Sequence, residues 1–168
     1  MLITKERNKL NQRISAISIT LAGLINPKQG QIIYSSYYSL SNFPLVERIK
    51  EKFNIPTFIG NYTRGLALAE HYFGASRDCL DSILISIHNG VGSGIIIQGK
   101  TLLGKNYNIG EIGHIQVNPA GKKCHCGNFG CLETEVSDHI VIEKVEKALE
   151  SGSFTSITPE TLSIENIY

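Results

Sequence analysis

Three of the four cysteines fall within eight residues of one glycine-rich segment, residues 113–133 (GHIQVNPAGKKCHCGNFGCLE). His114 precedes them, and nine residues separate it from Cys124. One imidazole and three thiolates form a Cys3His set, the ligand set of a closed, tetrahedral structural zinc site. The glycines between the cysteines let the backbone turn tightly enough for the sulfurs to converge. The spacing His114-x9-Cys124-x-Cys126-x4-Cys131 therefore predicts a structural Zn²⁺ site.

Two alternatives to zinc remain, a disulfide plus a free thiol and unrelated reduced cysteines. Cys124 and Cys126 are too close in sequence to bridge comfortably, and the expected compartment is reducing. His125, between these two cysteines, is a rival nitrogen ligand. The lysine pair at 122–123 would favour thiolates over thiols. Cys79 lies on a different segment, and we expect it to be a small buried apolar residue.

The length and composition describe one soluble domain. The chain has 168 residues, of which 42% are hydrophobic and 18% charged, as in ordinary globular proteins. Its net charge is +1 and its basic residues are scattered, so direct DNA binding by this chain is not expected. No apolar run is long enough to span a bilayer, and the charged segment 1–13 does not resemble a signal peptide. We expect a cytoplasmic protein without a membrane partner.

The hydrophobic periodicity predicts an α/β chain with a mixed sheet. Strands are predicted at 16–23, which we expect to be buried on both faces, at 31–36, at 55–60 and on both sides of the glycine turn at 90–94. Helices are predicted at 1–12, 44–53, 61–74, 138–151 and 158–162. The helix over 61–74 is expected to open at Asn61 or Thr63 and to close at Gly74. Ser137 is expected near the cap of the helix over 138–151.

Three motifs in order along the chain resemble the ROK family (repressors, open reading frames and sugar kinases). They are GVGSGIIIQG at 90–99, GEIGH at 110–114 and GKKCHCGNFGCLE at 121–133. The resemblance runs from about residue 16 to residue 134 and is strongest to the N-acetylglucosamine repressor branch. It implies part of an actin/hexokinase-like (ribonuclease H-like) α/β fold, in which two lobes enclose a sugar cleft and a structural zinc loop adjoins it.

The resemblance also implies roles for particular residues. It assigns zinc to His114, Cys124, Cys126 and Cys131, and sugar hydroxyls to Asn61, Glu111, His114 and Glu133. One nitrogen of His114 would then bind the metal while the other faces the sugar, so that the metal fixes the orientation and tautomer of the ring. Taken without the family, Glu111 and Glu133 would be interpreted as solvated surface charges.

The sequence departs from the family's kinases at the residue after Asn61. Those kinases have an aspartate there, which acts as general base on the sugar hydroxyl, whereas this chain has Tyr62. A phenol is a poor proton acceptor at neutral pH. Val91 also stands where kinases often have a threonine that donates to phosphate. The amides of 90–94 could form an anion nest, but we expect this turn simply to connect two strands.

The resemblance further implies a chain truncated at both ends. The kinase phosphate loop and the repressor helix-turn-helix would lie before residue 1, and the rest of the second lobe would lie after residue 168. We expect an incomplete ROK-type sugar-binding region at 1–134, a C-terminal helical extension at 135–168 and no DNA-binding domain. An exposed apolar flank is expected where the second lobe would pack, so a homo-oligomer or pairing with a full-length ROK protein is a further expectation.

These observations favour a non-catalytic regulator fragment that senses an amino sugar or its 6-phosphate, with N-acetylglucosamine 6-phosphate as the preferred ligand. The alternatives are an ATP-dependent sugar kinase, which Tyr62 disfavours, and a vestigial zinc-stabilised fragment without a ligand.

Overall fold

The computed structural model of the chain describes residues 14–153 and 155–167. The helix predicted over 1–12 lies outside the described residues. Within them the chain is α/β, as predicted, but its strands form three small sheets, one parallel and two antiparallel, and not the mixed sheet that was expected. The strands are β1 (Ile17–Leu21), β2 (Leu24–Asn26), β3 (Gln31–Ser35), β4 (Leu40–Phe43), β5 (Thr57–Asn61), β6 (Ser82–Ile87), β7 (Val91–Ile97) and β8 (Lys100–Thr101). The helices are α2 (Leu45–Phe53), α3 (Tyr62–Phe73), α4 (Glu133–Val136), α5 (Asp138–Glu150) and α6 (Ile164–Ile167), with a 3₁₀ turn, η1 (Ile112–His114).

The first apolar core lies where the parallel pair β1–β5 meets the antiparallel sheet β2–β3–β4. Leu21, Ile25, Ile32 and Ile59 are buried together, and the start of α2 packs against them. Parallel strands need a crossover connection, and here β2–β3–β4 and α2 supply it. Burying an aliphatic side chain of this size contributes about 1.5–3 kcal/mol, so this cluster holds the crossover onto the β1–β5 pair.

The helix α3 begins and ends where the sequence predicts. The Asn61 side-chain oxygen accepts a hydrogen bond from the backbone N–H of Arg64 at 3.2 Å, so Asn61, and not Thr63, is the N-cap. At the other end, the N–H of Gly74 donates to the Glu70 carbonyl at 3.0 Å. The capping signals in the sequence therefore set both ends of this helix.

Glycines of β7 allow α3 to pack closely on the sheet β6–β7–β8. A Cβ atom at Gly94 would overlap Ala67 and would lie 2.8 Å from the Thr63 carbonyl oxygen. A Cβ atom at Gly92 would lie 2.9 Å from the Thr63 hydroxyl. The backbone of β7 thus lies directly against α3, and a side chain at either glycine would separate the two elements.

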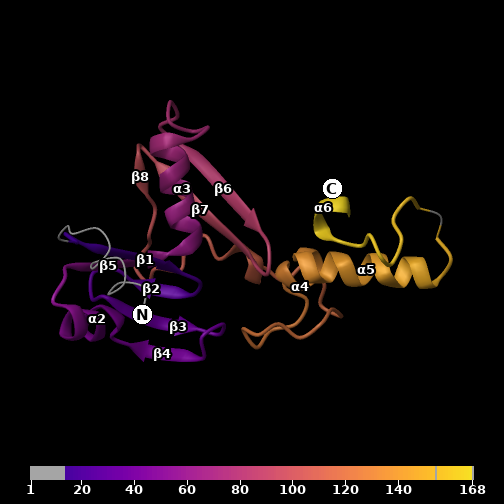
Figure 1. Cartoon of the computed structure of the whole chain (residues 1–168), viewed down its shortest axis with the longest axis horizontal. Coiled ribbons are helices and arrows are strands. Elements are labelled where there is room, and N and C mark those ends of the chain that lie inside the picture. Colours follow the sequence, from indigo (N-terminus) through magenta and orange to yellow (C-terminus); the bar gives the residue numbers. More distant parts are fainter. Residues whose placement is uncertain (1–13, 154, 168) are drawn as a thin grey trace.

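Figure 1 shows α3 lying across the sheet β6–β7–β8, with β1–β5 at one end of the molecule and α5 extending away at the other. Alternate side chains of β6 are exposed to solvent: Ile83 and Ile85 are 66% and 59% exposed. They alternate with Leu84 and Ser86, which are half-buried. This face is an exposed apolar flank of the kind expected from the sequence.

Two sequence-based expectations are wrong in detail. The strand β1 is buried on one face only, because its alternate residues Ser18 and Thr20 are exposed. Residues 159–161 of the predicted C-terminal helix form a turn, and the helix α6 begins later, at Ile164. The expected position of Ser137 is confirmed, since Ser137 is the N-cap residue of α5; its side chain makes no capping hydrogen bond and its hydroxyl lies 3.2 Å from His139 Nδ1.

We predict that Gly94→Ala lowers the free energy of unfolding by about 1–3 kcal/mol, the usual cost of overpacking. The added methyl group would push α3 off β7, which urea denaturation followed by far-UV circular dichroism would measure. Gly60→Ala is the matched control, since a Cβ atom at Gly60 meets nothing within 4 Å. Equal stability of the two variants would contradict the close packing of α3 on β7.

Candidate metal and sugar site

The 3₁₀ turn η1 positions His114 by direct backbone contact with β7. A Cβ atom at Gly113 would overlap the carbonyl oxygen of Val91, so only glycine allows this approach. Gly110 lies equally close to the Ser93 carbonyl, and the N–H of Ser93 donates to the Gly110 carbonyl at 2.8 Å. The segment that carries Glu111 and His114 is therefore fixed to the strand at two points.

The loop that carries the cysteines folds back against the segment after η1. The N–H of Leu132 donates to the Ile115 carbonyl at 2.9 Å, and the N–H of Val117 donates to the Gly130 carbonyl at 2.8 Å. Gly130 has a φ of 60°, in the left-handed region that glycine adopts without strain. These contacts bring Cys131 beneath η1, next to the ring of His114.

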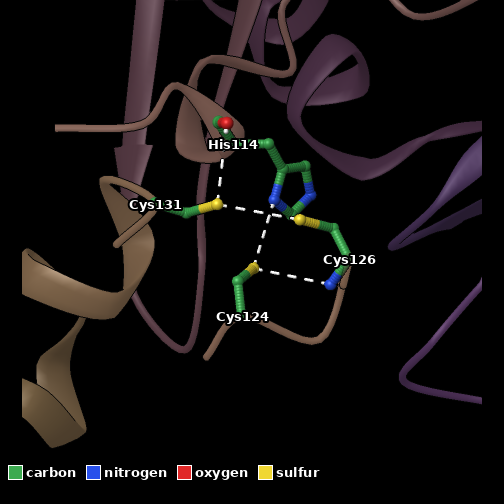
Figure 2. Close-up of side chains that lie close together, drawn as sticks. All are labelled: His114, Cys124, Cys126 and Cys131. Carbon is green, nitrogen blue, oxygen red and sulfur yellow. Dashed lines mark hydrogen bonds between the residues drawn. The ribbon is translucent and has the colours of Figure 1, made fainter. Parts of the chain in front are cut away.

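Figure 2 shows His114, Cys124, Cys126 and Cys131 pointing toward a common centre. Their candidate ligand atoms all lie within 4.8 Å of one another. His114 Nδ1 is 3.6 Å from the Cys124 sulfur, and the sulfurs of Cys126 and Cys131 are 3.7 Å apart. The four residues predicted as metal ligands from their spacing thus converge in space.

These separations fit a tetrahedral zinc ion. With Zn–S about 2.3 Å and Zn–N about 2.0 Å, two ligands of one tetrahedral ion lie about 3.5–3.8 Å apart. Three sulfurs and one imidazole are also the donors of a closed structural zinc site. Both the geometry and the chemistry of the donor set therefore suit Zn²⁺.

A second group overlaps the first, since His114 and Cys124 also lie near His125 and Glu133. The Glu133 carboxylate is 2.9 Å from His125 Nδ1 and 3.0 Å from the Cys124 sulfur. Both distances are shorter than the roughly 3.3–3.5 Å expected between two ligands of one tetrahedral ion; the second is a hydrogen bond that the Cys124 thiol donates to the carboxylate. The geometry therefore favours Cys126 and Cys131 over His125 and Glu133 as the remaining ligands.

Burial disfavours the thiolate form at two of the three clustered cysteines. Burial raises the pKa of Cys124 and of Cys131. At Cys126 burial is the largest single effect and acts to raise the pKa, but hydrogen bonds from the backbone N–H of Asn128 and from the thiols of Cys124 and Cys131 together outweigh it and the pKa is lowered. Lys122, one of the two lysines expected to favour thiolates, forms an ion pair with Glu143 on α5, and its hydrogen bond helps lower the pKa of that carboxyl to about 2.

Two of the predicted sugar-binding carboxylates lie beside this cluster. Glu133 is buried, and one of its oxygens is 3.7 Å from His114 Nδ1. The pKa of Glu111 is raised, chiefly by burial; the charges of Arg64 and His114 oppose this shift and that of Glu133 adds to it. Glu111, His114 and Glu133 therefore form one group of interacting charges, which spacing alone would not reveal.

Asn61, the fourth predicted sugar ligand, is engaged in the fold. Its oxygen caps α3, and its amide nitrogen donates to the Gly23 carbonyl at 3.0 Å. Tyr62, the next residue, begins α3 and is 45% exposed. No hydrogen bond within the described part of the chain joins Asn61 directly to Glu111 or Glu133. Asn61 is linked to Glu111 indirectly, because it accepts a hydrogen bond from the backbone N–H of Arg64, whose charge attracts Glu111.

The sequence analysis missed Arg64, which is only 5% exposed. Its Nη2 donates to the carbonyls of Tyr107 and Ile109, at 2.6 and 2.8 Å, and so ties α3 to the segment leading to Glu111. Desolvation lowers its pKa, and the charge of Glu111 opposes that shift. The sequence did contain a signal for the burial of Arg64, because this residue lies three residues before the buried Ala67, on the same face of the helix.

Two further expectations can be compared with the structure. The glycine turn expected at 90–94 is misplaced: residues 91–94 belong to β7, where Gly92 and Gly94 are register partners of Ser86 and Leu84 of β6, and residues 88–90 connect the two strands. Cys79, expected to be buried, is exposed, because it lies in the loop between α3 and β6 and not under a sheet.

Comparison with known proteins agrees with this architecture. The sequence pattern of the ROK family matches residues 1–167, so the chain belongs to the ROK family. The match is longer than the region 16–134 that carries the recognisable motifs. The chain is 46% identical over 165 residues to the DNA-binding transcriptional dual regulator NagC of Escherichia coli K12, and the alignment covers 98% of this chain and 40% of NagC. It therefore spans about two fifths of the length of the curated relatives that it matches.

Solved structures show the same fold. A ROK family transcriptional regulator, described as a homologue of the E. coli MLC protein, superimposes with a TM-score of 0.80 at 40% identity, over 95% of this chain and 43% of that one. A ROK family glucokinase from Streptomyces griseus gives a TM-score of 0.84 at 24% identity, over 99% of this chain and 56% of that one. The second likeness concerns the fold alone. Among the described residues, no helix is both long and apolar enough to cross a bilayer.

We predict that Cys126→Ser lowers the zinc content of the purified, reduced protein from about one ion per chain to a small fraction of that, and lowers its melting temperature. Losing one of four ligands removes binding energy that is coupled to folding. Mass spectrometry of the metal and a thermal melt with and without chelator would measure both effects. Cys79→Ser, at an exposed thiol outside the cluster, should change neither. Unchanged zinc in Cys126→Ser would exclude this ligand set.

We predict that Glu111→Gln raises the free energy of unfolding at neutral pH. Because burial raises its pKa, Glu111 holds a proton more readily in the folded than in the unfolded chain, so stability falls as pH rises through the titration of the carboxyl group. Glutamine cannot ionise, so it removes this loss of stability. The difference in the free energy of unfolding between the variant and the native chain should disappear below about pH 4, where Glu111 is protonated in both the folded and the unfolded chain. Urea titrations between acid and neutral pH would show it. Glu146→Gln, at an exposed position on α5, is the control.

Proposed function

We propose that this chain is the sugar-sensing part of a ROK-type transcriptional regulator of the N-acetylglucosamine repressor kind, and that it has no catalytic activity. Relatives that are 46% and 33% identical to this chain are named as transcriptional regulators, which supports the regulator class. The ligand would be an amino sugar or its 6-phosphate. In this proposal residues 1–134 bind the sugar, residues 135–168 form a helical extension, and the protein acts in the cytoplasm.

The observation that carries the proposal is the convergence of Glu111, His114 and Glu133 beside the Cys3His cluster. Carboxylates in fixed positions accept hydrogen bonds from the adjacent hydroxyls of a sugar ring, and this site holds two of them partly or fully buried. Nδ1 of His114 faces the sulfurs, which leaves Nε2 for the ligand. Asn61, at the start of α3, would complete the set of contacts.

In this proposal zinc would have a structural role and no catalytic role. Held by three thiolates and Nδ1 of His114, the ion has no open coordination position for a substrate. Its role would be to fix the tautomer and the orientation of the His114 ring. The same loop ends at Glu133, the first residue of α4, so that closing the loop also places this carboxylate.

The alternative function is an ATP-dependent sugar kinase, favoured only by the likeness to kinase folds. Phosphoryl transfer needs a base on the sugar hydroxyl, and the first turn of α3, where the family's kinases have an aspartate, holds Tyr62 and no acidic residue. Phosphoryl transfer from ATP that persists in Tyr62→Phe would establish the kinase. A chain that binds zinc but no sugar would instead be the vestigial fragment.

We predict that N-acetylglucosamine or its 6-phosphate binds the zinc-loaded chain, and that Glu133→Gln weakens binding about tenfold or more. The substitution keeps the shape of the side chain but removes the charge that strengthens a hydrogen bond to a hydroxyl. Isothermal titration calorimetry would measure both affinities. Glu146→Gln should bind as the native chain does. Absence of heat from either sugar at millimolar concentration would refute the sugar-sensing proposal.

A further inference from the structure

The carboxylate of Glu133 is contacted at one of its two oxygens only. Three groups approach Oε1: His125 Nδ1 at 2.9 Å, the Cys124 thiol, which donates a hydrogen bond at 3.0 Å, and His114 Nδ1 at 3.7 Å. No hydrogen bond or ion pair between described residues reaches Oε2. The loop that carries the cysteines therefore holds one edge of this carboxylate and leaves the other edge without a partner.

The second oxygen, Oε2, reaches solvent. In the described part of the chain, the one fully buried side-chain polar atom without a hydrogen-bond partner is His71 Nδ1. Oε2 of Glu133 also lacks a partner, so it is not fully buried. Gly90 lies beside it, since a Cβ atom there would be 3.4 Å from Oε2. Oε2 is thus the oxygen that can accept a hydrogen bond from a ligand.

Two of the three groups around Oε1 belong to the favoured metal ligand set. A cysteine binds Zn²⁺ as a thiolate, which has no proton to donate, so Cys124 would lose its hydrogen bond to Glu133 when the ion is bound. Nδ1 of His114 faces the sulfurs and would be occupied by the metal. His125 lies outside this set, and its Nδ1 is the closest of the three groups to Oε1. Of the three, only His125 would remain available to Oε1 in the zinc-loaded chain.

The ring of His125 is held in place by its neighbours. His125 lies between Cys124 and Cys126, so closing the metal site fixes its backbone on both sides. Its ring packs edge-on against the ring of His114, with the centroids 5.2 Å apart and an angle of 81° between the planes. A ring nitrogen 2.9 Å from a carboxylate oxygen carries a proton, because two lone pairs at that distance repel each other.

We propose that His125 is a positioning residue, which contacts Oε1 of Glu133 through Nδ1–H and so directs Oε2 toward a hydroxyl of the sugar. This inference rests on the proposed function and deepens it, since it names the residue that orients one of the two ligand-binding carboxylates. The last torsion of a glutamate side chain is broad, so a carboxylate without a contact at one oxygen samples many orientations. A ligand would then have to order this group on binding, which weakens the affinity.

Two other interpretations of His125 lead to different results. As the rival metal ligand, His125 would hold zinc together with Glu133, and its replacement would remove the metal. As a half-exposed side chain without a role, it would affect neither zinc nor sugar binding. Zinc content and sugar affinity measured on the same variants therefore separate the three interpretations.

The experiment measures zinc by mass spectrometry, and affinity for N-acetylglucosamine and its 6-phosphate by calorimetry on the zinc-loaded chains. His125→Leu places a methyl group where Nδ1 lies; we expect it to keep its zinc and to bind the sugar about three- to tenfold more weakly, the effect of losing one hydrogen bond. His125→Asn places an amide at the same branch of the side chain and should bind within about twofold of the native chain. His139→Leu, the same substitution at an exposed histidine on α5, should bind as the native chain does.

Two further measurements show whether His125 acts through Glu133. In a chain that already carries Glu133→Gln, adding His125→Leu should weaken binding by less than about twofold, because the carboxylate that His125 orients is gone. In the native zinc-loaded chain without sugar, ¹H–¹⁵N spectroscopy of the imidazole rings should find a proton on Nδ1 of His125. A residue that only supported the fold would change neither measurement in this way.

Each outcome decides the inference. It is overturned by unchanged sugar affinity or by loss of zinc in His125→Leu, by failure of His125→Asn to restore binding, by a full additional loss in the double variant, or by a bare Nδ1. All of these results leave the sugar-sensing proposal standing, because that proposal is tested on the native chain. If the native chain binds neither sugar, the sugar-sensing proposal fails and the inference fails with it.

Discussion

The close contact of η1 with β7 is the constraint on which the rest of the site depends. Gly113 lies against the Val91 carbonyl, where any side chain would collide, and this contact sets the position of His114. The cysteine loop then closes on His114 through backbone hydrogen bonds from Leu132 and Val117. If the strand and the turn were separated by one side chain, the four ligand atoms would not converge. The glycines of the family motif thus serve packing first, and the ligand geometry follows from it.

The same strand carries the second half of the site through α3. Gly92 and Gly94 allow α3 to lie against β7, which brings the first turn of the helix toward the segment before Glu111. Arg64 then spans the remaining distance with two hydrogen bonds to backbone carbonyls. The candidate metal ligands and Arg64 of α3 therefore both act on the charge of Glu111 or lie beside Glu133. The fold is shared with a ROK family glucokinase, and in this chain Tyr62 and Arg64 lie in the first turn of α3.

Local signals in the sequence predicted much of the fold. The period of apolar residues located α2, α3 and α5, and the capping residues Asn61 and Gly74 set the ends of α3. Where prediction failed, the cause was tertiary. The apolar run of β1 suggested burial on both faces, but its sheet is covered on one side only among the described residues. Cys79 was expected inside because cysteine is usually buried, yet its loop lies at the surface.

The sequence by itself predicted a metal ligand set and determined the family and the absence of an acidic residue after Asn61, because each is a matter of residue identity and spacing along one segment. Only the tertiary structure decided which nitrogen of His114 faces the sulfurs, that the Glu133 carboxylate lies against His125 and Cys124, and that Arg64 is buried beside Glu111. These relations join segments up to 47 residues apart, from Arg64 to Glu111 (111 − 64 = 47). Electrostatic energy and burial depend on distance in space, which the packing of α3 and η1 on β7 sets.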